Sequence, residues 1–176
     1  MRHAGLTLIE ILITLAILAI LFGIMPPLMS GWVAKIQTQA TVRSLSHHLH
    51  WARVEAIARF TRVGVCPLDP SNLAHCGDSY SQGWLIFEDV NRNRRYGKGD
   101  VLLRIKRLSN SSVVFKNRTG THTVTRTIWF RGNGVSGSAM TLVACKNELP
   151  EQAAGLVLNN IGRISLRSHF SACSKR

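Results

Sequence analysis

The stretch that decides the fold runs from Met1 to Met29 and reads MRHAGLTLIEILITLAILAILFGIMPPLM. Arg2 gives residues 1–5 a positive charge, and Glu10 is the only ionisable side chain in the apolar run over residues 6–29. At about 1.5 Å per residue, that run is long enough to cross a bilayer as a helix. The charge before the run predicts a single inner-membrane pass with a cytoplasmic N-terminus and a periplasmic C-terminal domain.

An ordinary secretory signal has a small-residue cleavage site after its apolar segment. No such site follows this run, and Pro26 and Pro27 occupy the place instead. Proline removes a helical hydrogen bond, so the pair predicts a bend or interruption between two helical halves.

Glu10 is the unusual residue of the run, because a carboxylate within a membrane helix costs a few kcal/mol and usually marks a function. The alternative is a carboxyl near the interface that is protonated or reaches water. The run Gly5-Leu6-Thr7-Leu8-Ile9-Glu10 resembles the class III signal of type IV pilins and pseudopilins. The resemblance implies cleavage by a prepilin peptidase between Gly5 and Leu6, and N-methylation of Leu6.

By the same resemblance, Glu10 neutralises the terminal amine of a neighbouring subunit during assembly. Two buried charges of opposite sign relieve each other's desolvation, so the pairing is physically reasonable. The implied partners are the prepilin peptidase, the inner membrane before assembly and other pilin subunits in a filament. The final location is then an extracellular pilus.

The chain continues with an amphipathic helix expected from about Trp32 to Arg62. Apolar residues recur there at three- and four-residue spacing, at Val42, Leu45, Leu49, Ala52, Ala56 and Phe60. The run His47-His48-Leu49-His50 within it is predicted to be a solvated helix face rather than a metal site. The predicted organisation is a leader at 1–5, a transmembrane helix and filament core at 6–29, an amphipathic helix at 30–62 and a β-rich head at 63–176.

Short apolar runs separated by turn residues predict strands throughout the head. They are Arg62–Cys66, Trp84–Glu88, Val101–Arg107, Ser112–Asn117, Arg126–Arg131, Ala139–Cys145, Gly155–Asn159 and Gly162–Arg167. Alternation predicts Leu103 and Ile105 on one face of their strand and Arg104 and Lys106 on the other. The fold class is therefore α+β, a type IV pilin-like lollipop with a long N-terminal helix packed on antiparallel β-sheet.

Two runs in the head sharpen the resemblance. The segment 83–91, GWLIFEDVN, is followed by Asp100-Val101-Leu102-Leu103-Arg104, and together they resemble the FimT/GspH group of minor pilins and pseudopilins. The segment 128–134, IWFRGNG, and the closing Gly162-Arg163 fit the same group. No arrangement typical of catalysis emerges, so we expect no enzyme and no cofactor.

Four cysteines, Cys66, Cys76, Cys145 and Cys173, fit two disulfides in an extracytoplasmic domain. The sequence leaves three connectivities open. Pro67 and Pro70 stiffen the segment after the first cysteine and favour a local Cys66–Cys76 clamp. Cys145–Cys173 would then pin the C-terminal tail to the body.

The charge predicts an anionic partner, because Lys+Arg is 22 against Asp+Glu 9, for a formal net charge of +13. Eleven basic residues lie between Asn91 and Arg131. Of these, the candidates for DNA contact are Arg92, Arg94, Arg95, Lys98, Arg104 and Lys106.

The C-terminal strand carries the sharpest DNA-binding candidates, with a solvated strand face as the alternative. Alternation predicts Ile164 and Leu166 toward the core and Arg163 and Arg167 outward, at a spacing of roughly 7 Å that suits successive phosphates. FimT-like pilins of competent bacteria bind DNA through a G-R-x-R element, which Gly162 and Arg163 resemble. Ser165 stands where the second arginine belongs, so Arg167, Lys175 and Arg176 are the substitutes.

The loop Asp89-x-Asn91-x-Asn93 begins like a calcium loop, but Arg94 stands at the sixth position, where such a loop has glycine, and Arg95 follows it. A structured hairpin loop without a metal is therefore expected.

Two functions remain. One is a minor pilin that binds DNA, double-stranded and without sequence preference, for uptake in natural transformation. The other is a structural minor pilin or a GspH-like type II secretion pseudopilin.

Overall fold

The computed structural model describes residues 7–109, 112–146, 153–167, 170 and 173, apart from the side chains of residues 23–30. The chain divides into two compact units, Met1–Ala34 and Lys35–Arg176. One long helix and eight strands make up the regular structure of the described residues, with a 3₁₀ turn, η1 (Tyr80–Gln82).

Helix α1 (Leu8–Arg59) is capped at its N-terminus by Thr7, whose hydroxyl and carbonyl oxygens accept hydrogen bonds from the Glu10 amide. The helix runs through Pro26 and Pro27, so of the predicted bend or interruption the interruption is wrong. Each proline removes its own amide donor, but the residues on both sides of the pair remain helical.

The C-terminal end of α1 lies at Arg59 rather than Arg62. Phe60 adopts a left-handed conformation with φ of 51°, and the Thr61 amide donates to the Ala56 carbonyl at 3.2 Å. A left-handed residue just past the last turn cannot continue a right-handed helix, so α1 stops there.

In the first unit, the described part of α1 presents large apolar side chains on every face. They are exposed, and include Leu8, Ile9, Ile11, Leu12, Ile13, Leu15, Ile17, Leu18, Ile20, Leu21 and Phe22. A helix that is apolar all round needs an apolar environment. No helix within the described residues combines the length and the apolarity required to cross a membrane.

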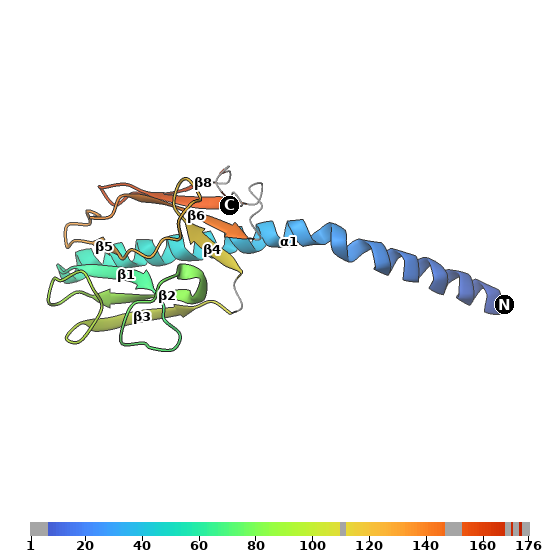
Figure 1. Ribbon diagram of the computed structural model, residues 1–176, viewed down its shortest axis with the longest axis horizontal. Coiled ribbons are helices and arrows are strands. Elements are labelled where there is room, and N and C mark those ends of the chain that lie inside the picture. Colours follow the sequence, from blue (N-terminus) through green and yellow to red (C-terminus); the bar gives the residue numbers. More distant parts are fainter. Residues whose placement is uncertain (1–6, 110–111, 147–152, 168–169, 171–172, 174–176) are drawn as a thin grey trace, which may run out of the picture. The chain divides into compact units, whose positions relative to one another are not determined.

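All eight predicted strands are present, with boundaries that differ by at most two residues. They are β1 (Val63–Pro67), β2 (Gly83–Glu88), β3 (Val101–Arg107), β4 (Val113–Lys116), β5 (Ile128–Phe130), β6 (Met140–Lys146), β7 (Ala154–Leu158) and β8 (Ile164–Arg167). They form two antiparallel sheets, in the orders β3-β2-β1-β5 and β4-β6-β7-β8. The predicted α+β class is confirmed, and the head contains two sheets (Figure 1).

The second half of α1 shares one hydrophobic core with both sheets. Leu45 and Leu49 of the helix are fully buried, together with Trp84 of the first sheet and Phe115 and Leu142 of the second. Each such side chain contributes roughly 1.5–3 kcal/mol by leaving water. This shared core fixes the positions of the loops at the ends of both sheets.

Each sheet also buries part of its other face, and a disulfide closes each of these smaller cores. Cys66 is bonded to Cys76 beside Leu85 and Phe87, and Cys145 is bonded to Cys173 beside Val143. Both favoured cysteine pairings are confirmed.

The predicted common face of Leu103 and Ile105 is wrong. Leu103 packs against the main core and Ile105 against the Cys66–Cys76 core. The pairing of β2 with β3 shifts register between Ile86 and Phe87. Such a β-bulge reverses the facing of the residues beyond it, which simple alternation cannot foresee.

Candidate functional sites

Glu10 lies in the first turn of α1, three residues after its N-terminal cap. Its amide donates to the Thr7 hydroxyl at 3.4 Å, and its side chain is exposed. Within the described residues the Glu10 carboxylate forms no ion pair. A carboxylate at this position interacts favourably with the positive end of the helix dipole. Gly5 and Leu6, the predicted cleavage and methylation residues, lie outside the described residues.

A second candidate site surrounds Trp129 of β5, whose side chain is almost buried. The guanidinium carbons of Arg94, Arg62 and Arg131 lie 4.7, 5.1 and 5.4 Å from its ring centroid. Cations stacked on an aromatic face are held in place at about 0.5–1 kcal/mol each. Trp129 therefore contacts arginines from the α1–β1 connection, from the β2–β3 loop and from the turn after β5.

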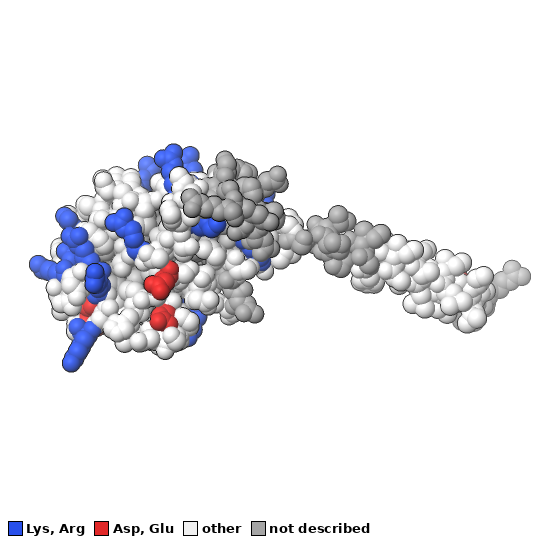
Figure 2. Space-filling view, in the orientation of Figure 1, with Lys and Arg blue, Asp and Glu red and all other residues white. Residues whose placement is uncertain are grey.

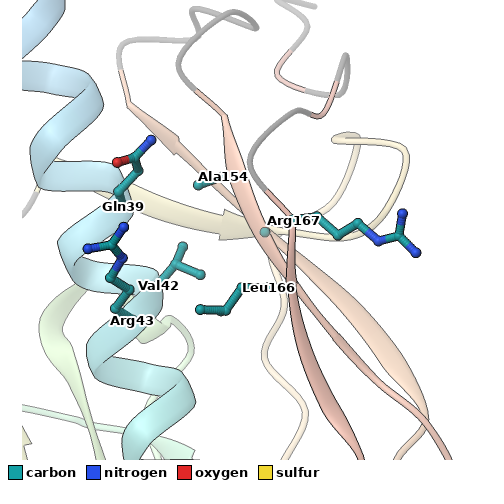
Figure 3. Close-up of a pocket in the computed structure, with 7 residues that line it drawn as sticks. Gln39, Val42, Arg43, Ala154, Leu166 and Arg167 are labelled. Carbon is teal, nitrogen blue, oxygen red and sulfur yellow. The ribbon is translucent and has the colours of Figure 1, made fainter.

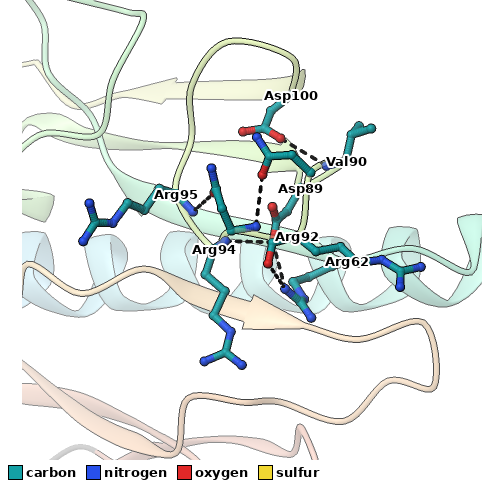
Figure 4. A network of polar contacts seen from close by, with 9 residues as sticks. Arg62, Asp89, Val90, Arg92, Arg94, Arg95 and Asp100 are labelled. Atoms are coloured by element: carbon teal, nitrogen blue, oxygen red, sulfur yellow. Dashed lines mark hydrogen bonds and ion pairs between the residues drawn. The ribbon is translucent and has the colours of Figure 1, made fainter.

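The β2–β3 loop is held by its own polar side chains (Figure 4). The Asp89 carboxylate accepts a hydrogen bond from the Arg94 amide at 3.1 Å, and Asn91 and Asn93 accept from the amides two residues further on. Asp100 closes the loop by accepting from the Val90 and Gly97 amides. The oxygens that resemble a calcium loop are thus engaged with backbone donors.

The same hydrogen bonds keep two arginines in strained conformations. Arg92 and Arg94 have φ values of 60° and 66°, in the left-handed region that non-glycine residues rarely adopt. Such a conformation costs of order 1–3 kcal/mol of folding free energy, and strained residues are common at functional sites. Figure 4 shows the side chains of Arg92, Arg94 and Arg95 leaving the loop in different directions.

One buried acid lies among these cations. Asp89 is 1% exposed and forms an ion pair with Arg62 at 3.2 Å. Arg62 also donates to the Arg92 carbonyl at 2.8 Å. Asp89 thereby neutralises one arginine and leaves the exposed ones uncompensated.

Arg53 of α1 holds the β7–β8 hairpin at the same end of the head as the β2–β3 loop. Its Nε donates to the Gly134 carbonyl at 2.9 Å and its Nη2 to the Ile161 carbonyl at 3.1 Å. The Gly134 amide in turn donates to the Arg131 carbonyl at 2.8 Å. The hairpin that carries Arg163 therefore lies beside the turn that carries Arg131.

We call this set the arginine surface: Arg62, Arg92, Arg94, Arg95, Arg131 and Arg163. All but Arg62 are exposed, and these five form no ion pair within the described residues. Figure 2 shows Lys and Arg side chains gathered at the end of the head where the β2–β3 loop and the β7–β8 hairpin lie. Arg59 and its partners Glu55 and Glu88 stand at the margin.

The C-terminal prediction needs two corrections. Arg163 lies in the turn before β8, four residues from Arg167, so about 13 Å of strand separates them rather than 7 Å. Leu166 is 50% exposed, although it points toward α1 while Arg167 points away (Figure 3). Because β8 is an edge strand, the helix does not cover its end, and a cavity of about 180 Å³ remains beside Val42.

Other predicted residues lie apart from the arginine surface. Arg104 stacks on Trp51, at 4.3 Å from the ring centroid, on the opposite edge of the first sheet. Lys106 lies near it, and Lys98 is exposed in the β2–β3 loop. Lys175 and Arg176 lie outside the described residues.

His48 departs from the predicted solvated helix face, since it packs edge-on against Trp84 at 5.5 Å between ring centroids. Burial lowers the pKa of His48, and the nearby cations Arg104 and Lys106 act in the same direction. Among the residues that the structure describes, no cluster of His, Cys, Asp and Glu side chains is suited to holding a metal ion.

The sequence reasoning missed the roles of Trp129, Arg62 and Arg53. The sequence indicated only that Trp129 belongs to a strand. Because neighbouring residues of a strand face opposite sides, the apolar residues Ile128 and Phe130 on either side of it were the available signal that Trp129 faces away from the main core. Nothing in the sequence indicated that residues 53 and 134 meet.

Residues 41–162 match the family model described as Type II transport protein GspH, and residues 1–26 match that of the prokaryotic N-terminal methylation motif. The Pilin-like protein PilA1 of Thermus thermophilus is 36% identical over 100 residues, which cover 57% of each chain. The match thus spans little more than half of that relative's length.

Two crystal forms of the type IV minor pilin FimU of Pseudomonas aeruginosa PAO1 share the fold. One gives a TM-score of 0.58 at 18% identity, covering 77% of this chain and 92% of FimU. The other gives 0.55 at 20% identity, covering 73% and 91%. The minor pseudopilin EpsH of the Vibrio cholerae type 2 secretion system gives 0.49 at 13% identity, covering 75% and 97%.

Proposed function

Since this chain belongs to the GspH family of type II transport proteins, we propose that it is a minor pilin that enters an extracytoplasmic filament through its N-terminal helix and binds DNA through the arginine surface. The uncompensated cluster of arginines around Trp129 is the observation that carries the DNA-binding part. DNA uptake in natural transformation is the process that such a subunit would serve.

The assembly part rests on the N-terminal methylation motif and on the apolar helix. In our proposal, a prepilin peptidase cleaves between Gly5 and Leu6, and Leu6 becomes the methylated N-terminus. Before assembly, residues 6–29 span the inner membrane as a helix, and the head lies in the periplasm. On assembly, Glu10 pairs with the terminal amine of a neighbouring pilin, and the apolar faces pack against other helices.

Charge and geometry support the DNA-binding part. Guanidinium groups form charge-assisted hydrogen bonds with phosphate oxygens, and phosphate contacts carry no sequence information. The loop hydrogen bonds and the Trp129 stack hold several of these groups before a ligand arrives, which lowers the entropic cost of binding. Arg163 belongs to this surface, and Arg167, Lys175 and Arg176 supply further phosphate contacts along the bound DNA.

The test is a titration of the full chain, in micelles of an uncharged detergent, against a short duplex at several salt concentrations. If about four phosphates are neutralised, the slope of log affinity against log salt is roughly −3 to −4. Two unrelated duplex sequences should bind equally. Absence of binding at low salt would contradict the DNA-binding part.

A second candidate is a structural minor pilin or a type II secretion pseudopilin that primes assembly without DNA. The match to the GspH family model is the observation that favours it. The same titration separates the two candidates, because a purely structural subunit has no reason to show a steep salt dependence.

A further inference from the structure

We propose that the arginine surface binds single-stranded DNA more tightly than duplex, because the ring of Phe60 is placed to stack on an unpaired base. This inference rests on the proposed DNA binding and specifies the form of DNA that the surface selects. Three features of Phe60 carry it: its exposure, its backbone conformation and its position among the arginines.

Phe60 is the most exposed large apolar side chain of the described residues, at 87%. No aromatic contact involves its ring within that part of the chain, in contrast to Trp129, which lies beneath three guanidinium groups. Both faces of the ring are therefore open to a ligand.

The backbone conformation at residue 60 is energetically unfavourable for phenylalanine. With φ of 51°, residue 60 occupies the left-handed position after a helix, where glycine or asparagine is favoured. A phenylalanine there is a rare residue in a strained conformation. Neither the end of α1 nor the packing of the head requires an aromatic ring at this position.

Phe60 is also fixed beside the cations. A Cβ added at Gly132 would lie 2.8 Å from the Phe60 carbonyl carbon, so the turn that carries Arg131 rests directly on this residue. Arg62 follows two residues later and reaches Trp129. The residue that carries the exposed ring thus lies beside the turn of Arg131 and two residues before Arg62, whose guanidinium groups suit a phosphate backbone.

This pairing of an open ring with phosphate-binding cations favours a strand with unpaired bases over a protein partner. A base stacked on an aromatic side chain contributes at any sequence, since every base has a π-face. Bases within a duplex are already stacked on each other and are not available to Phe60. Arginines alone would bind both forms, so the ring is what distinguishes them.

The experiment compares Phe60→Gly and Phe60→Trp in the full chain, in uncharged detergent micelles. Fluorescence anisotropy is measured with a labelled oligothymidine of about 20 nucleotides and a duplex of the same length, since single-strand sites span roughly 4–16 nucleotides. Glycine removes the ring and suits the left-handed backbone, so the variant folds. Leu73→Ala, which shortens an exposed apolar side chain in the Cys66–Cys76 loop, is the matched control.

We expect Phe60→Gly to weaken binding of the single strand by about fivefold or more, the lower end of one lost stacking contact. Duplex affinity should not change, and Phe60→Trp should keep the wild-type affinity for the single strand. Equal binding of the single strand by Phe60→Gly and wild type would overturn the inference, while duplex binding would still support the proposed function. An effect of Phe60→Gly on filament incorporation with unchanged DNA affinity would also overturn it, because it would assign the ring to a protein contact. Failure of both DNA forms to bind would overturn both proposals.

Discussion

Gly162 lies directly against the carbonyl oxygen of Gly134, so that a Cβ at residue 162 would approach that oxygen to 2.3 Å. Arg53 occupies the adjoining space and donates to the same carbonyl. This contact holds the hairpin of Arg163 against the turn of Arg131. The glycine of the Gly162-Arg163 pair therefore has a structural reason to be glycine, whatever the arginine binds.

Gly162→Ala should lower the free energy of unfolding by about 3 kcal/mol. About 1–2 kcal/mol comes from placing alanine in a left-handed conformation, and the remainder from the steric conflict. Gly99→Ala is the matched control, since Gly99 also has a positive φ but no atom lies within 4 Å of its added Cβ. Urea unfolding followed by tryptophan fluorescence checks the difference, and equal costs would show that the contact is not tight.

Glu10→Gln should reduce incorporation into sheared filaments by at least about tenfold, which corresponds to about 1.4 kcal/mol. The amide retains the shape of the side chain and leaves the Thr7 cap in place, but it cannot pair with an ammonium group. Thr14→Val serves as control, because Thr14 bonds only to the Ile11 carbonyl within α1. Incorporation of Glu10→Gln at the wild-type level would contradict the assigned role of the charge.

The two disulfides should differ in their contribution to stability. The Cys145–Cys173 pair is separated by 28 residues and the Cys66–Cys76 pair by 10. Loop-closure entropy then gives about 3.6 kcal/mol for the first and about 2.7 kcal/mol for the second. Paired Cys→Ala variants, compared by urea unfolding, test this order. A larger loss on removing Cys66 and Cys76 would contradict it.

His48 should make the head less stable in mild acid. Burial lowers its pKa from the ordinary value of 6.5, so the unfolded chain takes up a proton before the folded one. Stability from this residue is therefore fully present above about pH 7 and is lost as the pH falls from 6.5 toward the folded pKa. His48→Gln should flatten the urea midpoint across that window, whereas the exposed His50→Gln should not. An unchanged pH dependence in His48→Gln would show that another group causes it.

Local signals in the sequence located the amphipathic part of the helix and the strands. Apolar periodicity located the helical face of Leu45 and Leu49, and turn residues separated all eight strands. The cysteine pairing could be anticipated because Pro67 and Pro70 restrict the first loop. Patterns of this kind depend on neighbours within a few residues, which the sequence displays directly.

The candidate site was only partly predictable, because it depends on contacts between distant segments. The sequence placed Arg94 and Arg163 among the basic residues, but it could not show that Arg53 joins their two loops through Gly134 and Ile161. It also grouped Arg163 with Arg167, although they lie at opposite ends of β8. The bulge in β2–β3 pairing likewise arises from tertiary packing and has no local signature.

The most direct test of DNA binding by the arginine surface is the salt dependence of duplex binding in Arg94→Gln/Arg131→Gln. These two arginines stack on Trp129 and form no ion pair within the described residues. Each lost phosphate contact reduces the slope of log affinity against log salt by about 0.9, so the double variant should be shallower by about 1.8. Arg118→Gln/Arg126→Gln removes the same charge from exposed positions in the β4–β5 connection and should keep the wild-type slope. Equal slopes for the two double variants would contradict the arginine surface as the DNA-binding site.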